Sequence, residues 1–216
     1  MSQRFLNLIR TGETAEVAAA AEEDKSLVAC RDAQGVSALL WSVYNGQPLI
    51  RDFLVAHLPE LDVFEASAVG DCARLESLLR QDAVLAYQTS ADGWSPLHLA
   101  AAFGGHQATA LLLAHGAHVH QSSRNPMHNQ PLHACIALGG ELETVRLLIA
   151  QGADMNAAQA GGYTPLHQAA AAGRRELVLL LLDAGADPGR LCDQGKTPGE
   201  YARERGHQLI TELLPA

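Results

Sequence analysis

The chain has few of the features that mark membrane or disulfide-rich proteins. Its cysteines have no paired spacing, which excludes a zinc knuckle and a disulfide framework; they are Cys30, Cys72, Cys135 and Cys192. No apolar run approaches the roughly 20 residues that a membrane span needs, and residues 1–10 lack the apolar stretch and cleavage site of a secretory signal. We therefore expect a cytoplasmic protein with reduced thiols and no membrane contact.

Positive charge is also scarce. The sequence has 15 lysines and arginines against 24 aspartates and glutamates, for a formal net charge of −9. Such a chain has no basic field to attract a phosphate backbone, so we expect no nucleic-acid partner. Only Lys25 and Lys196 are lysines, and alanine is abundant, which favours a GC-rich genome such as a bacterial one.

Catalytic motifs are missing as well. The sequence contains no Gly-x-Ser-x-Gly elbow, no phosphate-binding glycine loop and no His-Glu-x-x-His. Its acidic residues are spread over loops and the two ends rather than paired. The prediction is a protein that is not an enzyme and needs no cofactor.

What the sequence does have is an internal repeat. The tetrapeptides SPLH, QPLH and TPLH occupy residues 95–98, 130–133 and 164–167, and a degraded copy starts at Thr197-Pro198. Each full copy opens an alanine-rich run that ends in glycine and leads to a leucine cluster. Serine or threonine followed by proline is typical of the first turn of a helix, and glycine is typical of its end. The glycines that close the first helix of each repeat predict seven helix pairs: Gly12, Gly46, Gly70, Gly104, Gly140, Gly173 and Gly206.

This period and punctuation resemble the ankyrin repeat. The resemblance implies an all-α solenoid of about seven stacked helix-turn-helix repeats with short β-hairpin fingers. We expect one domain over residues 1–216, with an N-terminal capping repeat at 1–31 and a C-terminal capping repeat at 191–216. The internal repeats are expected at 32–60, 61–90, 91–120, 121–157 and 158–190. Because both ends have the polar character of caps, we expect a complete, monomeric domain.

Two intervals between the marker glycines are unusual. The step from Gly46 to Gly70 is about ten residues short, and the step to Gly140 is long. The short interval predicts a missing finger, hence a gap in the finger row near residue 60. The long interval predicts an enlarged finger from Val119 to Gln130.

Ankyrin domains generally act by holding another protein, so the resemblance implies a non-catalytic interaction module, such as an adaptor or scaffold, whose partner the sequence does not identify. The partner is expected along the concave face formed by the fingers and first helices. The predicted contact residues are Tyr44, Asp92, Trp94, Phe103, Arg124, Met127, His128, Leu138, Tyr163 and Lys196. The aromatic and apolar members are of the types enriched in binding hot spots. Alternatively, Trp94 and Tyr163 pack on neighbouring finger stems.

The histidines allow a second hypothesis. In ankyrin repeats the histidine that ends the tetrapeptide bonds to backbone across the adjacent loop, which implies a structural role for His98, His133 and His167. Four more histidines surround the enlarged finger within residues 115–128. His118, His120 and His128 are candidate metal ligands, and the alternative function is a metal- or small-ligand-responsive regulator. No carboxylate or cysteine lies in this segment to complete a site, so a solvated loop is the other interpretation.

Overall fold

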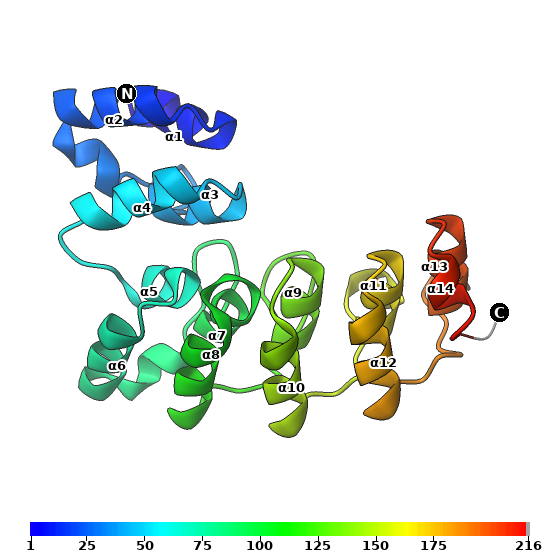
Figure 1. The fold of residues 1–216 in the computed structure, drawn as a ribbon. Helices are drawn as coiled ribbons and strands as arrows, with labels where there is room; N and C mark the ends of the chain where they lie inside the picture. Colours follow the sequence, from blue (N-terminus) through cyan, green and yellow to red (C-terminus); the bar gives the residue numbers. More distant parts are fainter. Residues whose placement is uncertain (215–216) are drawn as a thin grey trace.

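In the computed structural model, residues 1–214 are described, and their α-helices form a row of seven pairs (Figure 1). Each pair consists of a first helix, a tight turn and a second helix. The pairs are α1 (Ser2–Thr11) with α2 (Thr14–Glu23), α3 (Ala38–Tyr44) with α4 (Pro48–His57), α5 (Val63–Val69) with α6 (Cys72–Gln81), α7 (Pro96–Leu99) with α8 (Gly105–Ala114), α9 (Pro131–Ala137) with α10 (Leu142–Ala150), α11 (Pro165–Ala171) with α12 (Arg175–Asp183), and α13 (Pro198–Glu204) with α14 (Gln208–Thr211). The predicted all-α solenoid is confirmed. Each proposed repeat segment contains one pair, although residues 215–216 of the last segment lie outside the described residues.

The tetrapeptide explains where the first helices begin. At α11 the hydroxyl of Thr164 accepts a hydrogen bond from the His167 amide, and His167 Nδ1 accepts one from the Thr164 amide at 3.2 Å. This reciprocal cap satisfies two of the amides that a helix start leaves unpaired. Pro165 stands at the first helical position, where no donor is needed. The same reciprocal pattern recurs at α7, and at α9 the Gln130 amide donates to His133 Nδ1 at 3.3 Å.

Apolar packing between neighbouring pairs forms the core. Leucines of the second helices, including Leu112, Leu148 and Leu181, are fully buried. The first helices contribute buried alanines such as Ala134 and Ala169, whose small side chains let adjacent helices approach closely. No single pair could bury these surfaces alone, so the stacking itself stabilises the fold.

Two of the seven marker glycines do not have the expected backbone. Neither Gly104 nor Gly140 has a positive φ, which belongs instead to their neighbours Gly105 (82°) and Gly139 (86°). Both positions require glycine because a side chain would not fit. A Cβ on Gly104 would meet the carbonyl oxygen of Ser67 on the neighbouring repeat, and a Cβ on Gly140 would lie 2.7 Å from the carbonyl oxygen of Ala101. The first helix of the fourth repeat ends at Gly104, as expected. A π-helical turn, Ala100–Gly104, carries the helix on from α7 to this end.

The fingers are hydrogen-bonded turns. Their stems are closed by bonds such as Asp32 N–Val36 O at 2.9 Å, Ser90 N–Trp94 O at 2.8 Å and Gln159 N–Tyr163 O at 2.9 Å. Within residues 1–214 the ladder pairing is limited to one isolated antiparallel bridge, between Arg31 and Ser37. The fingers that the sequence predicts as β-hairpins are therefore turns closed by backbone hydrogen bonds, without regular strands in the described residues. Short 3₁₀ turns follow two of the second helices, at Lys25–Ala29 and Ala83–Tyr87, and another precedes α11, at Ala160–Gly162.

The row of pairs bends sharply after the second repeat. Figure 1 shows the two helices of a pair side by side for α1 to α4, whereas in the later pairs, as with α9 and α10, the first helix lies above the second. Second helices pack along one another at the other steps of the row, but α4 does not pack comparably on α6, while the first helices α3 and α5 remain in contact. The bend therefore closes toward the first helices and deepens the concave side. Arg31 holds the joint through an ion pair to Asp62 at 2.9 Å.

The expected gap in the finger row is closed. No finger projects between α4 and α5, as predicted, but the fingers on either side of that position meet. A Cβ built on Gly35 of the first finger would lie 3.1 Å from the Cβ of Ala91 in the next one. The bend brings these two tips together and removes the opening.

Candidate functional site

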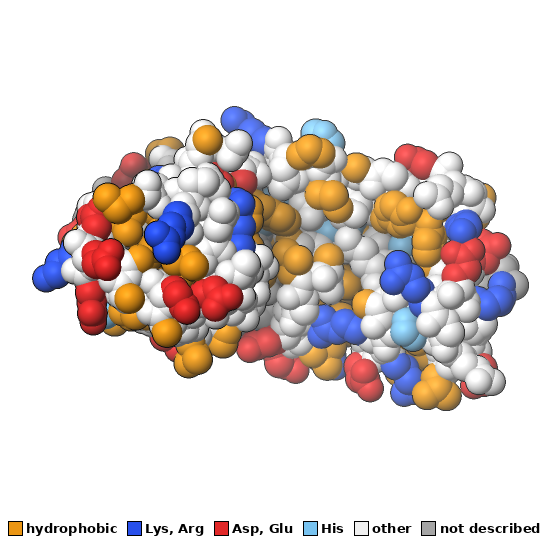
Figure 2. All heavy atoms as spheres, turned by 90° about the horizontal axis from the view of Figure 1, so that it is seen from above, with side chains coloured by type: hydrophobic (Ala, Val, Ile, Leu, Met, Phe, Trp, Pro, Cys, Tyr) orange, Lys and Arg blue, Asp and Glu red, His pale blue; other side chains and the backbone are white. Residues whose placement is uncertain are grey.

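A recess on the concave side lies at this bend. It has a volume of about 250 Å³, and we call it the corner recess; it is lined by Val36, Trp41, Tyr44, Asp92, Trp94, Phe103 and Leu138. These residues come from the second, fourth and fifth repeats. Figure 2 views the molecule from above and shows hydrophobic side chains gathered in a hollow beside the raised N-terminal block.

Local structure explains how α3 and the π-helical turn supply the recess. The Ser37 hydroxyl caps α3 by accepting a bond from the Leu40 amide at 3.2 Å, and Trp41 and Tyr44 then lie one turn apart on the same face. On the fourth repeat, Phe103 lies inside the π-helical turn. A π turn adds a residue to the helix and changes the direction of the side chains beyond it.

Small side chains set the depth of the recess. Ala68 is buried beneath it in an apolar cluster with Val36, Leu40 and Leu99. Because Ala68 projects so little, Tyr44 of the second repeat contacts Phe103 of the fourth, with ring centroids 5.7 Å apart. Two repeats that are not neighbours in the row thus share one aromatic surface.

A hydrogen bond also joins the second and fourth repeats at the recess. The Tyr44 hydroxyl donates to Asp92 Oδ2 at 2.7 Å, although the two residues are 48 positions apart. The Ser90 hydroxyl donates to the other oxygen, Oδ1. Burial, and then the Asp92 carboxylate, raise the pKa of Tyr44, so its hydroxyl stays protonated and keeps donating. Asp92 is therefore held in place at the rim of the recess.

Trp41 is anchored from its other side. Its indole Nε1 donates to Asp32 Oδ2 at 2.9 Å, and the guanidinium of Arg10 lies 3.9 Å from its ring centroid. The sequence interpretation missed Trp41 and Val36. Trp41 precedes the predicted Tyr44 by three residues in a helix, and this spacing is the signal that could have identified it.

Half of the predicted contact residues come together in the corner recess: Tyr44, Asp92, Trp94, Phe103 and Leu138. Leu138 is 44% exposed, so part of the apolar surface faces solvent. The other five predicted residues lie elsewhere, in two groups.

Arg124, Met127 and His128 belong to the enlarged finger. The Arg124 amide donates to the Gly93 carbonyl at 2.8 Å, which ties this finger to the preceding one. Met127 is 45% exposed. His128 has a left-handed backbone with φ of 47°. These side chains line the fingertips beyond the recess.

Tyr163 and Lys196 form a separate cluster on the sixth and seventh repeats. The hydroxyls of Tyr163 and Tyr201 are 3.0 Å apart, and their rings meet edge to face. Lys196 Nζ pairs with Glu204 at 2.6 Å and lies 5.5 Å from the Tyr201 ring centroid. The side chains of this cluster are engaged with one another, so the predicted contact residues do not form a single surface.

The structural role of the tetrapeptide histidines is confirmed. The Nε2 atoms of His98, His133 and His167 lie 2.9, 3.0 and 3.1 Å from the carbonyl oxygens of Asn129, Ala157 and Lys196. Burial lowers the pKa of both His98 and His133 to about 4. These imidazoles are neutral, and each links its repeat to the finger of the next repeat through a hydrogen bond to a backbone carbonyl.

The histidines of the enlarged finger have separate contacts. His115 Nε2 lies 3.2 Å from a Glu76 carboxylate oxygen, and His118 packs on the Tyr87 ring with centroids 5.0 Å apart. Among residues 1–214, no three histidine, cysteine, aspartate or glutamate side chains are arranged to hold a metal ion. The structure therefore does not bring the candidate ligands His118, His120 and His128 together.

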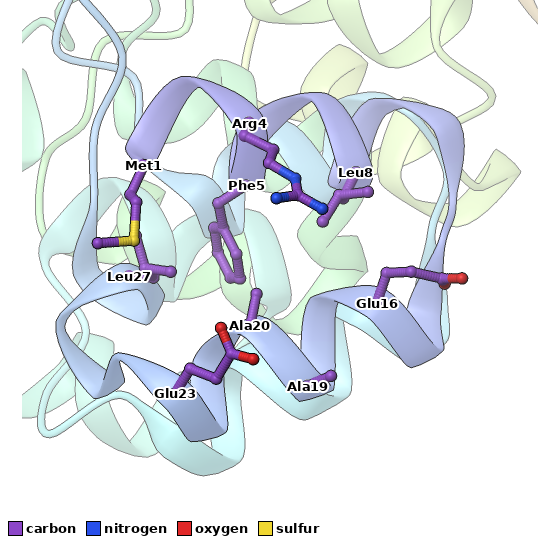
Figure 3. A pocket seen from close by; sticks show the side chains of 9 residues that line it. All are labelled: Met1, Arg4, Phe5, Leu8, Glu16, Ala19, Ala20, Glu23 and Leu27. Atoms are coloured by element: carbon purple, nitrogen blue, oxygen red, sulfur yellow. The ribbon is translucent and has the colours of Figure 1, made fainter.

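A second hollow lies between α1 and α2 (Figure 3). Its volume is about 240 Å³, with Phe5 and Leu8 in its wall and the charged side chains of Arg4, Glu16 and Glu23 around it. It belongs to the first repeat alone. None of the predicted contact residues lines it.

These features define a helical repeat protein with an apolar recess on its concave side. Comparison with known families matches the family of Ankyrin repeats (3 copies) over residues 63–159 and 132–216, more than half of the chain. The chain belongs to the ankyrin-repeat family. Proteins of this family generally bind other proteins and are typically non-catalytic.

Several curated proteins are similar to parts of the chain. A Transient receptor potential cation channel subfamily A member 1 homolog of Caenorhabditis elegans is 31% identical over 72% of this chain and 12% of its own length. The Potassium channel KOR1 of Oryza sativa subsp. japonica is 32% identical over 72% of this chain and 21% of its own length. The ARF GTPase-activating protein GIT2 of Mus musculus is 41% identical over 40% of this chain and 12% of its own length.

The chain thus spans about a fifth or less of the relatives it matches. All three come from eukaryotes, so they do not support the bacterial origin that the composition favours. None of the helices in the described part of the chain has both the length and the apolarity that a bilayer span needs.

Proposed function

We propose that the chain binds a partner protein without catalysis, and that the corner recess is the centre of the contact. The observation that carries the proposal is an aromatic hollow that stays open to solvent at the most concave point of the solenoid. Trp41, Tyr44, Trp94 and Phe103 are only half-buried there, and Leu138 is exposed. Aromatic residues of this kind dominate binding energy when a partner removes them from water.

The positions of the residues with shifted pKa values support a non-catalytic role. Outside the recess, His98, His133 and Cys135 have strongly shifted pKa values and are buried in the packing between repeats. The pKa of Tyr201 is raised, first by its hydrogen bond to Tyr163, in the separate cluster on the last two repeats. None of these four residues lines the recess. Within it, Tyr44 has a raised pKa, which makes its hydroxyl a weaker acid and poorly suited to transfer protons near neutral pH.

We place this binding in the cytoplasm and assign it to a monomer. The four cysteines are free and widely separated, which suits a reducing compartment. The channel and GTPase-activating functions named for the relatives are not part of the proposal, because the matches cover a fifth or less of those proteins. The metal-responsive alternative has no convergent ligand set to favour it.

Affinity capture with matched variants tests the proposal. Trp94→Ala/Phe103→Ala is compared with Leu49→Ala/Leu209→Ala, which removes two leucines that are 69% and 65% exposed away from the recess. We expect one protein to be retained by the wild type and the leucine variant and lost by the recess variant. Hot-spot truncations typically weaken binding by about 30-fold or more.

Stability must be separated from binding in this comparison. Thermal melting of each variant shows whether the fold is retained, and Leu138→Glu blocks the same surface at an exposed position without emptying the core. Retention of the same protein by all variants, or of no protein by the wild type, contradicts the proposal.

A further inference from the structure

The corner recess combines aromatic faces with one carboxylate that has no cationic partner. Ion pairs occur elsewhere in residues 1–214, as between Arg31 and Asp62, but no lysine, arginine or histidine nitrogen lies within 4.0 Å of an Asp92 oxygen. Asp92 is nevertheless half-buried and fixed in orientation by Tyr44 and Ser90. A positioned carboxylate without a counterion is electrostatically complementary to a cation.

The carboxylate also keeps unused acceptor capacity. Its two oxygens together offer about four lone-pair sites, and the hydroxyls of Tyr44 and Ser90 occupy one on each oxygen. One site on each oxygen is left. Two acceptors side by side in a plane match the parallel N–H pair of a guanidinium group.

The aromatic side chains suit the same group. The flat guanidinium stacks on indole and phenyl faces, which attract it through their quadrupoles. The protein already uses this contact beside the recess, where the Arg10 guanidinium lies 3.9 Å from the Trp41 centroid. The recess presents Trp94 and Phe103, for which no such partner is present within the described chain.

The surrounding charge is acidic on balance. Asp32 and Asp62 lie on the elements that pack around α3, and Tyr44 is affected by the charge of Asp62 as well as Asp92. Of the nearby cations, Arg10 lies over Trp41 and Arg31 pairs with Asp62. Arg124 lines a neighbouring hollow together with Asp92 but makes no ion pair with it, so the carboxylate is still available to a cationic side chain that enters the recess.

We propose that the corner recess receives an arginine side chain of the partner protein, with the guanidinium paired to Asp92 and stacked on the aromatic wall. The inference rests on the proposed function and names the chemistry that the recess recognises. Lysine satisfies the charge but has neither the planar fork nor the stacking surface. An aliphatic side chain would leave the carboxylate facing an apolar group.

The two tryptophans of the chain both line the recess, so their signals report its occupation directly. The probes are blocked nine-residue Gly/Ser peptides with one central residue: arginine, lysine, citrulline or leucine. Citrulline keeps the shape of arginine and removes its charge. Indole N–H resonances are followed by NMR at low salt in the wild type, in Asp92→Asn and in Asp193→Asn. The last variant makes the same charge change on the final finger, outside the recess.

We expect the arginine peptide to bind about tenfold more tightly than the citrulline peptide and to be weakened by salt. Asp92→Asn should abolish this preference, and Asp193→Asn should preserve it. A leucine peptide that binds as well as the arginine peptide overturns the inference but keeps the recess as the docking site. If no peptide shifts either indole resonance, both the inference and the recess as docking site fail.

Discussion

Acidification should loosen the solenoid through its buried histidines. His98 Nδ1 accepts bonds from the Ser95 hydroxyl and amide, while Nε2 donates to the Asn129 carbonyl at 2.9 Å. A second proton on Nδ1 would face the Ser95 N–H donor in a site that excludes water. His133 has the same arrangement with the Gln130 amide and the Ala157 carbonyl. Both imidazoles must therefore remain neutral for the repeats to stay braced.

The size of the effect follows from the two protonation equilibria. Burial lowers the pKa of His98 and His133 to about 4, whereas an unfolded histidine has a value of about 6.5. Between these values the unfolded state binds more protons, so stability falls as the pH decreases. From pH 7.5 to pH 5.5 each histidine should cost roughly 1 kcal/mol, and the pair between about 2 and 3 kcal/mol. His167, whose pKa is also lowered by burial, adds to the loss in the same direction.

Urea unfolding followed by helical circular dichroism at pH 7.5, 6.5 and 5.5 measures the effect. Wild type is compared with His98→Gln and His133→Gln, which cannot titrate in this range. Each variant should lose roughly 1 kcal/mol of the wild-type dependence on pH. Most carboxylates stay ionised over this range, and Glu65, whose pKa is raised by burial, is present in every variant. Equal pH dependence in all three proteins would refute the reasoning.

Two further predictions concern the bend and the stacking. Tyr44→Phe and Asp92→Ala should show a coupling free energy of about 1–2 kcal/mol in a double-mutant cycle of urea unfolding, because their bond joins the second and fourth repeats; additive effects would show that the bond is not formed. Gly104→Ala should destabilise the fold by about 3 kcal/mol, since its Cβ would meet the Ser67 carbonyl oxygen. Thermal melting checks this, with Gly139→Ala as the control for backbone strain alone, because no atom lies within 4 Å of its Cβ.

The regular parts of the fold could be predicted because their causes are local. A hydroxyl, a proline and a histidine within four residues specify how a first helix starts, as at residues 164–167. Glycine then specifies the turn, and leucine periodicity specifies the buried side of the second helix. Each signal acts over less than ten residues, so it can be read without knowledge of the neighbouring repeats.

The irregular parts depend on contacts that are distant in sequence. The short loop before Asp62 showed that a finger was missing, but not that the tips around Gly35 and Ala91 would meet. The π-helical turn depends on the close approach of Gly104 to Ser67, which is a packing constraint between repeats. The site was predicted in part for the same reason: residue types indicated Trp94 and Phe103, but not that Tyr163, two repeats further along, would be engaged with Tyr201 outside the recess.

The missing finger explains why the recess exists at all. A finger after α4 would stand between the tips at Gly35 and Ala91 and keep the second repeat apart from the fourth. Without it the row bends, Tyr44 reaches Asp92, and the tyrosine ring reaches Phe103 over the small side chain of Ala68. A deletion in the loop, an extra residue in the π-helical turn and one alanine together create a surface that regular stacking cannot provide. In this chain the regular stacking of helix pairs stabilises the fold, and the irregular positions form the aromatic recess that we propose as the binding surface.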